Sequence, residues 1–334
     1  MNKTILRNNI LVSVFKNNRG IIIVLLLIGI MLSILSPVFL TTDNLITVLR
    51  QISTNMYLAL GMTFVMILGG IDLSVGSIVA MCGTLIVGFI VTNGIPMIPA
   101  IILGILIGTF LGFVNGIVIA KFQVPAFIIT LATMNVARGI AYVYSGGRST
   151  RIVDDSFKRI GPGYIGFLPL PVLYMIILIF IFIILLSKTE FGTYVYAVGG
   201  NRESARLSGV PIKKVEIIVY TISGFLSAFA GLVLCSRLYS GQPSVGDGYE
   251  LDAIAACVLG GVSMAGGVGR ISGTIFGVIV IGIISNGLNL MNVSSYWQLI
   301  VKGFIIAIAV LIDSYKGKYK GSQKLLSKLG LRKQ

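Results

Sequence analysis

The residues that could carry chemistry are few, and their types exclude most kinds of active site. The chain has no histidine, so it holds no His-based metal site, no Ser/His/Asp triad and no histidine proton relay. Acids are scarce in the apolar segments, and those present lie near segment ends, as Asp72 and Asp252 do. Ion-coupled carriers usually need ionisable groups inside the membrane. The sequence therefore predicts neither an enzyme nor an ion-coupled carrier, with no catalytic residue and no metal site.

The sequence also lacks a recognisable nucleotide site. The P-loop pattern G-x-x-x-x-G-K-[ST], which cradles nucleotide phosphates, does not occur in the 334 residues. If the chain moves a solute uphill, another subunit must supply the energy. We expect ATP and magnesium to be bound by that subunit, and no cofactor to be bound by this chain.

A short polar run separates two apolar segments with almost no loop between them. Residues 69–77 read GGIDLSVGS. Asp72 can cap the following helix by accepting backbone N–H bonds. The apolar run before it is short, and a broken helix at membrane depth is tolerated only where it faces protein or a watery cavity. Asp72 and Ser74 are thus candidates for a structural cap or for a solute pathway, and Asn286 and Asn289, polar groups in an apolar run, are further pathway candidates.

One long charged loop, residues 188–214, interrupts the apolar series. The loop predicts a short amphipathic helix with Glu203 in its first turn, where the helix dipole favours an acid. Gly209 can adopt the left-handed cap after the helix end. We expect Ala205 to keep one face thin for a partner, with Arg206 on the same docking surface. The alternative is an ordinary cytoplasmic loop.

The elements that must position these residues are membrane helices. Hydrophobic residues make up 56% of the chain and charged residues only 11%, against about 25% charged in a soluble domain. A spanning helix needs roughly 20 apolar residues. We predict an all-α integral membrane protein, one domain over residues 1–334, with about ten transmembrane helices. The candidate spans are 20–40, 52–69, 72–91, 97–119, 125–144, 170–187, 215–237, 251–267, 271–291 and 296–313. The second and eighth are short or broken by glycine.

The basic residues orient these spans. With both termini in the cytoplasm, most of the 26 Lys and Arg residues fall on the inner side, which is the positive-inside signature. The net charge of +15 therefore points to anionic lipid, and not to nucleic acid. The basic tail, residues 316–334, is predicted to lie in the cytoplasm. The outer loop 145–170 is either solvated or a landing site for an external partner, and residues 238–250 form a second outer surface.

A second glycine-rich run suggests an internal repeat. Residues 260–267 read GGVSMAGG, which is a poor continuous helix. This run and the GGIDLSVGS run occupy corresponding places in two four-helix halves, residues 52–144 and 237–313. Glycine-interrupted segments at corresponding positions are a sign of structural repeats with a pathway at their interface.

Several long motifs carry a family resemblance. They are GIDLSVGS at 70–77, GGNRESARLSGV at 199–210, GYELDAIAACVLGGVSMAGGVGRISGT at 248–274 and NGLNLMNVSSYWQLIVKGFIIAIAVLID at 286–313. Over residues 20 to 315 the chain resembles the permease subunits of ribose-type ABC sugar importers. The pattern E-x-A-x-x-x-G, with Ser204 in place of the middle Ala, is similar to the E-A-A-x-x-x-G signature of importer permeases. Permeases for xylose, galactosides and the autoinducer-2 signal share many of these motifs.

The resemblance implies a function and a set of partners. It implies an importer of a monosaccharide, with ribose first and another sugar or autoinducer-2 as alternatives, in a bacterial cell membrane. Two permease copies would form the pathway, an ABC ATPase subunit would dock on the 188–214 loops, and an extracytoplasmic binding protein would deliver the sugar. Glu203, Ala205 and Gly209 match the coupling motif. A stand-alone facilitator is the alternative from another class, and uptake without an ATPase would favour it.

Overall fold

The computed structural model describes residues 18–152, 154–308 and 310–311, and nearly all of its regular structure is helical. The helices are α2 (Arg19–Leu35), α3 (Thr42–Ile67), α4 (Val75–Val91), α5 (Met97–Phe122), α6 (Ala126–Ser145), α7 (Asp155–Lys158), α8 (Leu170–Lys188), α9 (Glu190–Gly200), α10 (Arg202–Leu207), α11 (Ile212–Arg237), α12 (Tyr249–Leu259), α13 (Ile271–Leu290) and a last helix, Ser295–Ile308. The first basic residues and the basic tail 316–334 lie outside the described residues, so the side of the membrane on which the termini lie stays a prediction.

Five helices are long and apolar enough to cross a membrane, namely α5, α6, α8, α11 and α13. Helices α2, α4 and the last helix are apolar but shorter. Large apolar side chains such as Leu106, Phe110 and Phe180 are more than half exposed on these helices. A surface of this kind suits lipid rather than water. The structure therefore supports a helical membrane protein with five clear spans, while the predicted number of ten remains a prediction.

Helix α3 is the central helix of the core. It has 26 residues, and its side chains are buried without interruption from Ile52 to Ile67. The expectation of a short second span over 52–69 is therefore wrong. The helix begins ten residues earlier, in a stretch that holds Asp43, Asn44 and Arg50 and does not look apolar. The shortness of this span consequently gives no support to a broken helix before Asp72.

Glycine brings α5 and α11 into close contact. A methyl group at Gly112 would overlap the carbonyl oxygen of Tyr220, and one at Gly116 would lie 2.7 Å from the Cα atom of Ile217. Small residues at every fourth position let two membrane helices approach backbone to backbone. The buried glycines of α5 that meet α11 in this way are Gly108, Gly112 and Gly116, whereas Gly104 faces Ile86 of α4.

The eighth predicted span, 251–267, is discontinuous, as its glycines suggested. Helix α12 has only 11 residues and ends at Leu259. At 1.5 Å per residue it covers about half of the roughly 30 Å hydrocarbon core. Residues 260–270, called the broken segment below, are non-helical and lead into α13. Gly266 and Gly267 have φ angles of 85° and 70°, which glycine adopts without strain.

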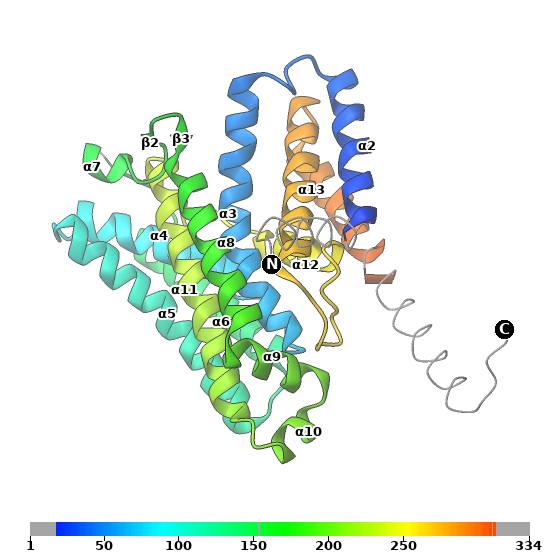
Figure 1. The fold of residues 1–334 in the computed structure, drawn as a ribbon. Helices are drawn as coiled ribbons and strands as arrows, with labels where there is room; N and C mark the ends of the chain where they lie inside the picture. The colour runs from blue at the N-terminus through cyan, green and yellow to red at the C-terminus, as the bar shows by residue number, and fades with distance from the viewer. Residues whose placement is uncertain (1–17, 153, 309, 312–334) are drawn as a thin grey trace, which may run out of the picture.

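Short helices and a hairpin lie at two opposite ends of the helical bundle (Figure 1). Helices α9 and α10 lie at one end, and α7 with the hairpin β2 (Tyr164–Ile165) and β3 (Leu168–Pro169) lies at the opposite end. At the hairpin end, β1 (Thr150–Arg151) pairs antiparallel with β4 (Ser240–Gly241). The two predicted outer loops, 145–170 and 238–250, are therefore parts of one surface.

Candidate functional site

The loop predicted to dock a partner folds into two helices, α9 and α10. Asn201 precedes α10, and its side-chain oxygen accepts a hydrogen bond from the backbone N–H of Ser204 at 2.8 Å. Glu203 lies in the first turn as predicted. Gly209 has a φ angle of 80°, and its N–H bonds to the carbonyl of Arg206 at 3.0 Å. Both ends of the predicted short helix are therefore confirmed.

Glu203 and Arg206 form an ion pair on the exposed face of α10. The guanidinium Nη2 and the carboxylate Oε1 are 2.6 Å apart, and Nε donates to both carboxylate oxygens at 3.0–3.1 Å. The hydrogen bond from Arg206 holds the pKa of the Glu203 carboxyl below its usual value. The pair thus stays ionised at neutral pH and offers both signs of charge to a partner.

Ala205 points the other way. Its side chain is only 4% exposed and belongs to the main apolar core, in which α9, α10 and α11 take part. We expected Ala205 to lie on the surface that a partner approaches, whereas in the structure its side chain lies against the core of the chain itself. Its small size instead allows α10 to lie close against the rest of the chain.

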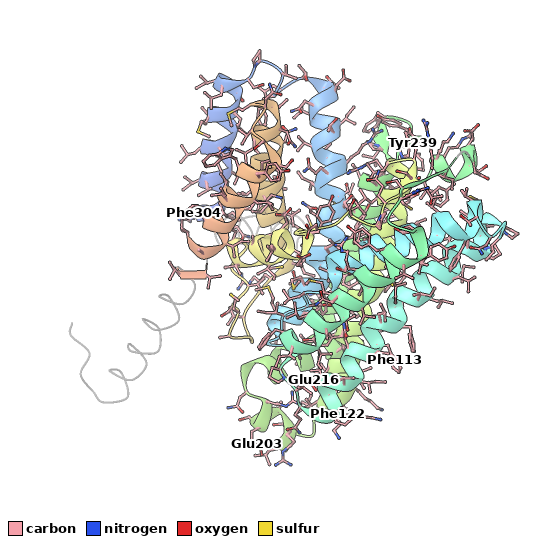
Figure 2. The ribbon with its side chains drawn as sticks, turned by 180° about the vertical axis from the view of Figure 1, so that it is seen from behind. Phe113, Phe122, Glu203, Glu216, Tyr239 and Phe304 are labelled. Atoms are coloured by element: carbon pink, nitrogen blue, oxygen red, sulfur yellow. The ribbon has the colours of Figure 1, made fainter. Side chains whose placement is uncertain are left out.

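Arg202 ties α10 to α11. Its guanidinium binds the carboxylate of Glu216 through both terminal nitrogens, with Nη2 3.1 Å from Oε2. Glu216 is 5% exposed and Arg202 46% exposed, so the acid is the buried partner. Figure 2 shows Glu203 and Glu216 at the same end of the molecule, opposite Tyr239. A cavity of about 780 Å³ lies at the Tyr239 end and one of about 630 Å³ at the Glu203 end.

The cavity at the α10 end is mainly basic. Its charged lining comes from α10 and from the first turn of α11, and it includes a single acid, Glu203. The lining residues are Gln123, Arg202, Glu203, Arg206, Val210, Pro211, Ile212, Lys213 and Lys214. The segment predicted to dock a partner therefore forms one rim of a concave surface.

Asp72 and Ser74 are brought together in a buried polar row. Asp72 is completely buried, and its Oδ1 accepts hydrogen bonds from the backbone N–H and the hydroxyl of Ser74, at 3.0 and 2.6 Å. Its Oδ2 accepts from the hydroxyl of Ser223 on α11 at 2.7 Å. Beyond Ser74, Asn115 donates to the Ser74 hydroxyl and Thr133 donates to Asn115, at 3.2 and 2.5 Å. The row joins α6, α5, the start of α4 and α11.

This row contains groups that the sequence reasoning missed. Asn115, Thr133 and Ser223 were not among the candidates, although each is a polar residue inside an apolar segment. Their spacing along the chain gives no sign that they meet. Only the packing of α5, α6 and α11 around residues 69–77 brings them to Asp72.

Asn286 and Asn289 belong to a different part of the fold. Asn286 on α13 exchanges two hydrogen bonds with Asn44 on α3, at 2.8 and 3.1 Å. Asn289 accepts from Gln298 on the last helix at 2.8 Å. Within the described residues no hydrogen bond links these pairs to the row at Asp72. The four pathway candidates therefore form three separate contacts.

The two basic residues within predicted spans have partners. Lys302 on the last helix pairs with Asp252 on α12, with Nζ 2.8 Å from Oδ2. Arg138 on α6 donates through Nη1 to the carbonyls of Pro243 and Val245, at 2.8 and 2.7 Å. Paired or hydrogen-bonded cations are the form in which charge is tolerated at membrane depth.

The cavity at the hairpin end is also basic. Arg151, Lys158 and Arg159 line it together with Tyr239, and no acid is among the described residues that line it. Lys158 pairs with the exposed Asp155, with Nζ 2.9 Å from Oδ1, and this contact lowers the pKa of the Asp155 carboxyl. The basic lining suits the binding of an acidic surface.

Comparison with known proteins places the chain in a transporter family. A family model described as branched-chain amino acid transport system / permease component matches residues 44–310. The chain is 46% identical over 306 residues to the ribose import permease protein RbsC of Haemophilus influenzae, covering 90% of this chain and 94% of that protein. It is 48% identical over 294 residues to RbsC of Bacillus subtilis, covering 87% and 91%.

A third relative carries another sugar in its name. The L-arabinose transport system permease protein AraH of Escherichia coli is 41% identical over 301 residues, which covers 90% of this chain and 92% of that protein. No solved structure matches the chain. The resemblance to permeases of ribose-type ABC importers is confirmed by these relatives. The chain therefore belongs to the family described as branched-chain amino acid transport system / permease component, and it is a multi-pass protein of the cell membrane.

Proposed function

We propose that the chain is the permease subunit of an ATP-driven importer that carries ribose into a bacterial cell. The observation that carries the proposal is the identity of 46–48% to two proteins named ribose import permease over about nine-tenths of the chain. The permease forms the pathway and performs no covalent chemistry. The absence of a histidine and of a P-loop in the sequence supports this division of labour.

The proposed topology has ten spans with both termini in the cytoplasm and α9–α10 on the cytoplasmic side. The excess of basic residues on that side supports it. The position of α9–α10 and of the hairpin β2–β3 at opposite ends of the bundle is consistent with it. The proposed repeat of two four-helix halves is supported by a similar order in each half, because α3 and α12 are each followed by a glycine-containing non-helical segment and another helix.

The proposed coupling surface is α10 with the adjoining basic cavity. Glu203, Arg206 and Gly209 would face an ABC ATPase subunit, which binds ATP and magnesium, while Ala205 seats α10 on the permease. The exposed Glu203–Arg206 pair supports docking through charge. Because the Arg202–Glu216 pair joins α10 to α11, a movement of α10 caused by the partner can be transmitted to a membrane helix.

The proposed external partner is a sugar-binding protein at the hairpin end. The cavity lined by Arg151, Lys158 and Arg159 would receive acidic side chains of that protein. A second copy of the permease completes the pathway. Anionic lipids are proposed to hold the basic tail 316–334, whose sequence alternates basic residues with leucine.

The pathway residues remain proposals. Asp72 and Ser74 are supported by the polar row of hydroxyl, amide and carboxylate groups around them, which are the groups that hydrogen-bond sugars. Asn286 and Asn289 are proposed as further pathway groups, and their amides are paired with Asn44 and Gln298.

L-Arabinose is the second candidate substrate, because a relative named for its transport is 41% identical over 301 residues. Uptake into proteoliposomes that contain the permease, its ATPase and its binding protein, with ATP inside, tests the choice. We expect labelled ribose to accumulate and a tenfold excess of unlabelled arabinose to leave its uptake nearly unchanged. Accumulation of arabinose and not of ribose would change the assigned substrate to arabinose and leave the permease assignment unchanged.

A further inference from the structure

The coupling segment touches the broken segment and the end of α3 at one place. Helix α9 brings Gly199 against the carbonyl of Ile67, the last residue of α3, and against the backbone of Gly266 and Gly267. The N–H of Gly267 donates to that same Ile67 carbonyl at 2.8 Å. We call the contact of Gly199, Gly266 and Gly267 with the Ile67 carbonyl the glycine junction.

The glycine junction has no space for a side chain. A methyl group at Gly199 would overlap the Ile67 carbonyl oxygen and lie 2.8 Å from the Gly267 nitrogen. A methyl group at Gly266 would lie 2.7 Å from the Gly199 carbonyl oxygen. The three segments therefore meet backbone to backbone. Because packed backbones cannot yield by changing rotamers, a displacement of one must displace the others.

Two side-chain contacts strengthen the connection. The hydroxyl of Tyr196 on α9 donates to the carbonyl of Gly269 at 2.7 Å. At the start of α9, the Phe191 ring stacks on Phe64 of α3, with centroids 6.2 Å apart. Helix α9 is thus bound to both segments that lead into the membrane, and the broken segment continues directly into α13.

We propose that the glycine junction transmits movement of α9–α10 to the broken segment, with Gly199 and Tyr196 as positioning residues for the coupling of ATP hydrolysis to transport. The inference rests on the proposed function. It assigns to glycine and to one tyrosine hydroxyl a role that the exposed charges of α10 do not have: α10 receives the partner, and the junction passes the movement inward.

The chain provides a matched pair of variants. Gly199 and Gly200 are neighbours in α9, yet a methyl group at Gly200 would meet no atom within 4 Å. Gly199→Ala must force the junction apart, whereas Gly200→Ala changes the same helix by the same methyl group without a clash. Tyr196→Phe removes only the hydroxyl that bonds Gly269.

The first measurement is the amount of ribose accumulated per ATP hydrolysed in proteoliposomes with equal amounts of assembled complex. We expect Gly199→Ala to keep ATP hydrolysis and to lower this ratio roughly two- to thirtyfold, the range for mutations that alter coupling between sites. Tyr196→Phe should lower the ratio less, and Gly200→Ala should match wild type. A wild-type ratio in Gly199→Ala would overturn the proposal, whether transport and hydrolysis are both normal or both reduced by the same factor. If the Gly199→Ala protein is not produced in the membrane, the test falls to Tyr196→Phe, and a wild-type ratio of ribose to ATP in that variant overturns the proposal.

A second measurement separates this inference from the choice of substrate. Val268 in the broken segment is 58% exposed, and the three native cysteines are buried, so a fluorophore can be placed on Val268→Cys selectively. Addition of ATP to the complex should change its fluorescence in the wild-type background and not with Gly199→Ala. A nucleotide response that persists with Gly199→Ala, or none in either background, contradicts the junction. If ribose is not taken up but this difference is seen, the proposed substrate fails and the junction stands.

Discussion

The Asp72 carboxylate accepts a hydrogen bond from the Ser223 hydroxyl at 2.7 Å, which joins the start of α4 to the middle of α11. The two residues are 151 positions apart, and both are buried. Asp72 also accepts hydrogen bonds from the N–H and the hydroxyl of Ser74, so these two donors and the Ser223 hydroxyl all depend on the Asp72 carboxylate. The carboxylate thus holds the entrance of α4 against α11.

Asp72→Ala should lower the amount of folded protein. The variant leaves the buried donors of Ser74 and Ser223 without an acceptor, and each such group costs about 1–3 kcal/mol. Asp72→Asn keeps an acceptor and should be milder. Thermal unfolding in detergent, followed by size-exclusion chromatography, measures the difference. A normally stable Asp72→Ala protein would contradict the structural role of this carboxylate, and slow ribose uptake by that protein would leave the proposed pathway role as its only one.

Glu203→Lys should weaken docking of the ATPase while the permease still inserts. The substitution breaks the pair with Arg206 and places two cations side by side on one face of α10. Because it reverses one charge of the proposed docking surface, we expect binding to weaken by about tenfold or more, equal to ~1.4 kcal/mol. Glu190→Lys makes the same charge change in the first turn of α9 and serves as the control. Titration of the ATPase against each purified variant measures the affinity. Equal affinities for wild type and Glu203→Lys would contradict the coupling role.

The Arg202–Glu216 pair should respond unequally to loss of its two partners. Arg202→Ala strands a carboxylate that is only 5% exposed, whereas Glu216→Gln leaves an arginine that is 46% exposed and can be hydrated. The cost of Arg202→Ala should stay below the about 3–5 kcal/mol that breaking a fully buried pair costs, because water screens the arginine side. Trypsin cleavage after Lys213 or Lys214 reports the seating of α10. Faster cleavage in Glu216→Gln than in Arg202→Ala would contradict this order.

The basic cavity at the hairpin end should be needed by the binding protein. Arg159→Glu places an acid among the lining residues and should reduce the stimulation of ATP hydrolysis by the sugar-loaded binding protein. The loss should shrink at high salt, since salt screens charges on exposed surfaces. Arg148→Glu, an exposed residue of the same loop outside the cavity lining, is the control. A similar loss in both variants would show that loop charge in general, and not the cavity, matters.

Local features of the fold could be predicted from the sequence because they depend on neighbouring residues. Glu203 in the first turn of α10 and Gly209 after its end follow from helix capping and backbone freedom. The break after α12 follows from the glycines of residues 260–267. The length of α3 could not be predicted from the hydrophobic pattern, because the first turns of this helix contain polar residues.

Long-range contacts could not be predicted. The Asn44–Asn286 pair joins residues 242 positions apart, and the Gly199–Ile67 contact depends on how α9 lies against α3. The inward direction of Ala205 was missed for a related reason. A residue on a six-residue helix can face either the solvent or the rest of the chain. Only the packing of α10 against α9 and α11 decides between them.

The dependence of ribose uptake on ATP hydrolysis by the partner subunit tests the account most directly. Proteoliposomes with the permease, the binding protein and either the active ATPase or a variant that binds but does not hydrolyse ATP are loaded with ATP and supplied with labelled ribose. We predict accumulation above the external concentration with the active ATPase only. Equal entry with both ATPase forms, or entry through the permease alone, would contradict it and favour a facilitator.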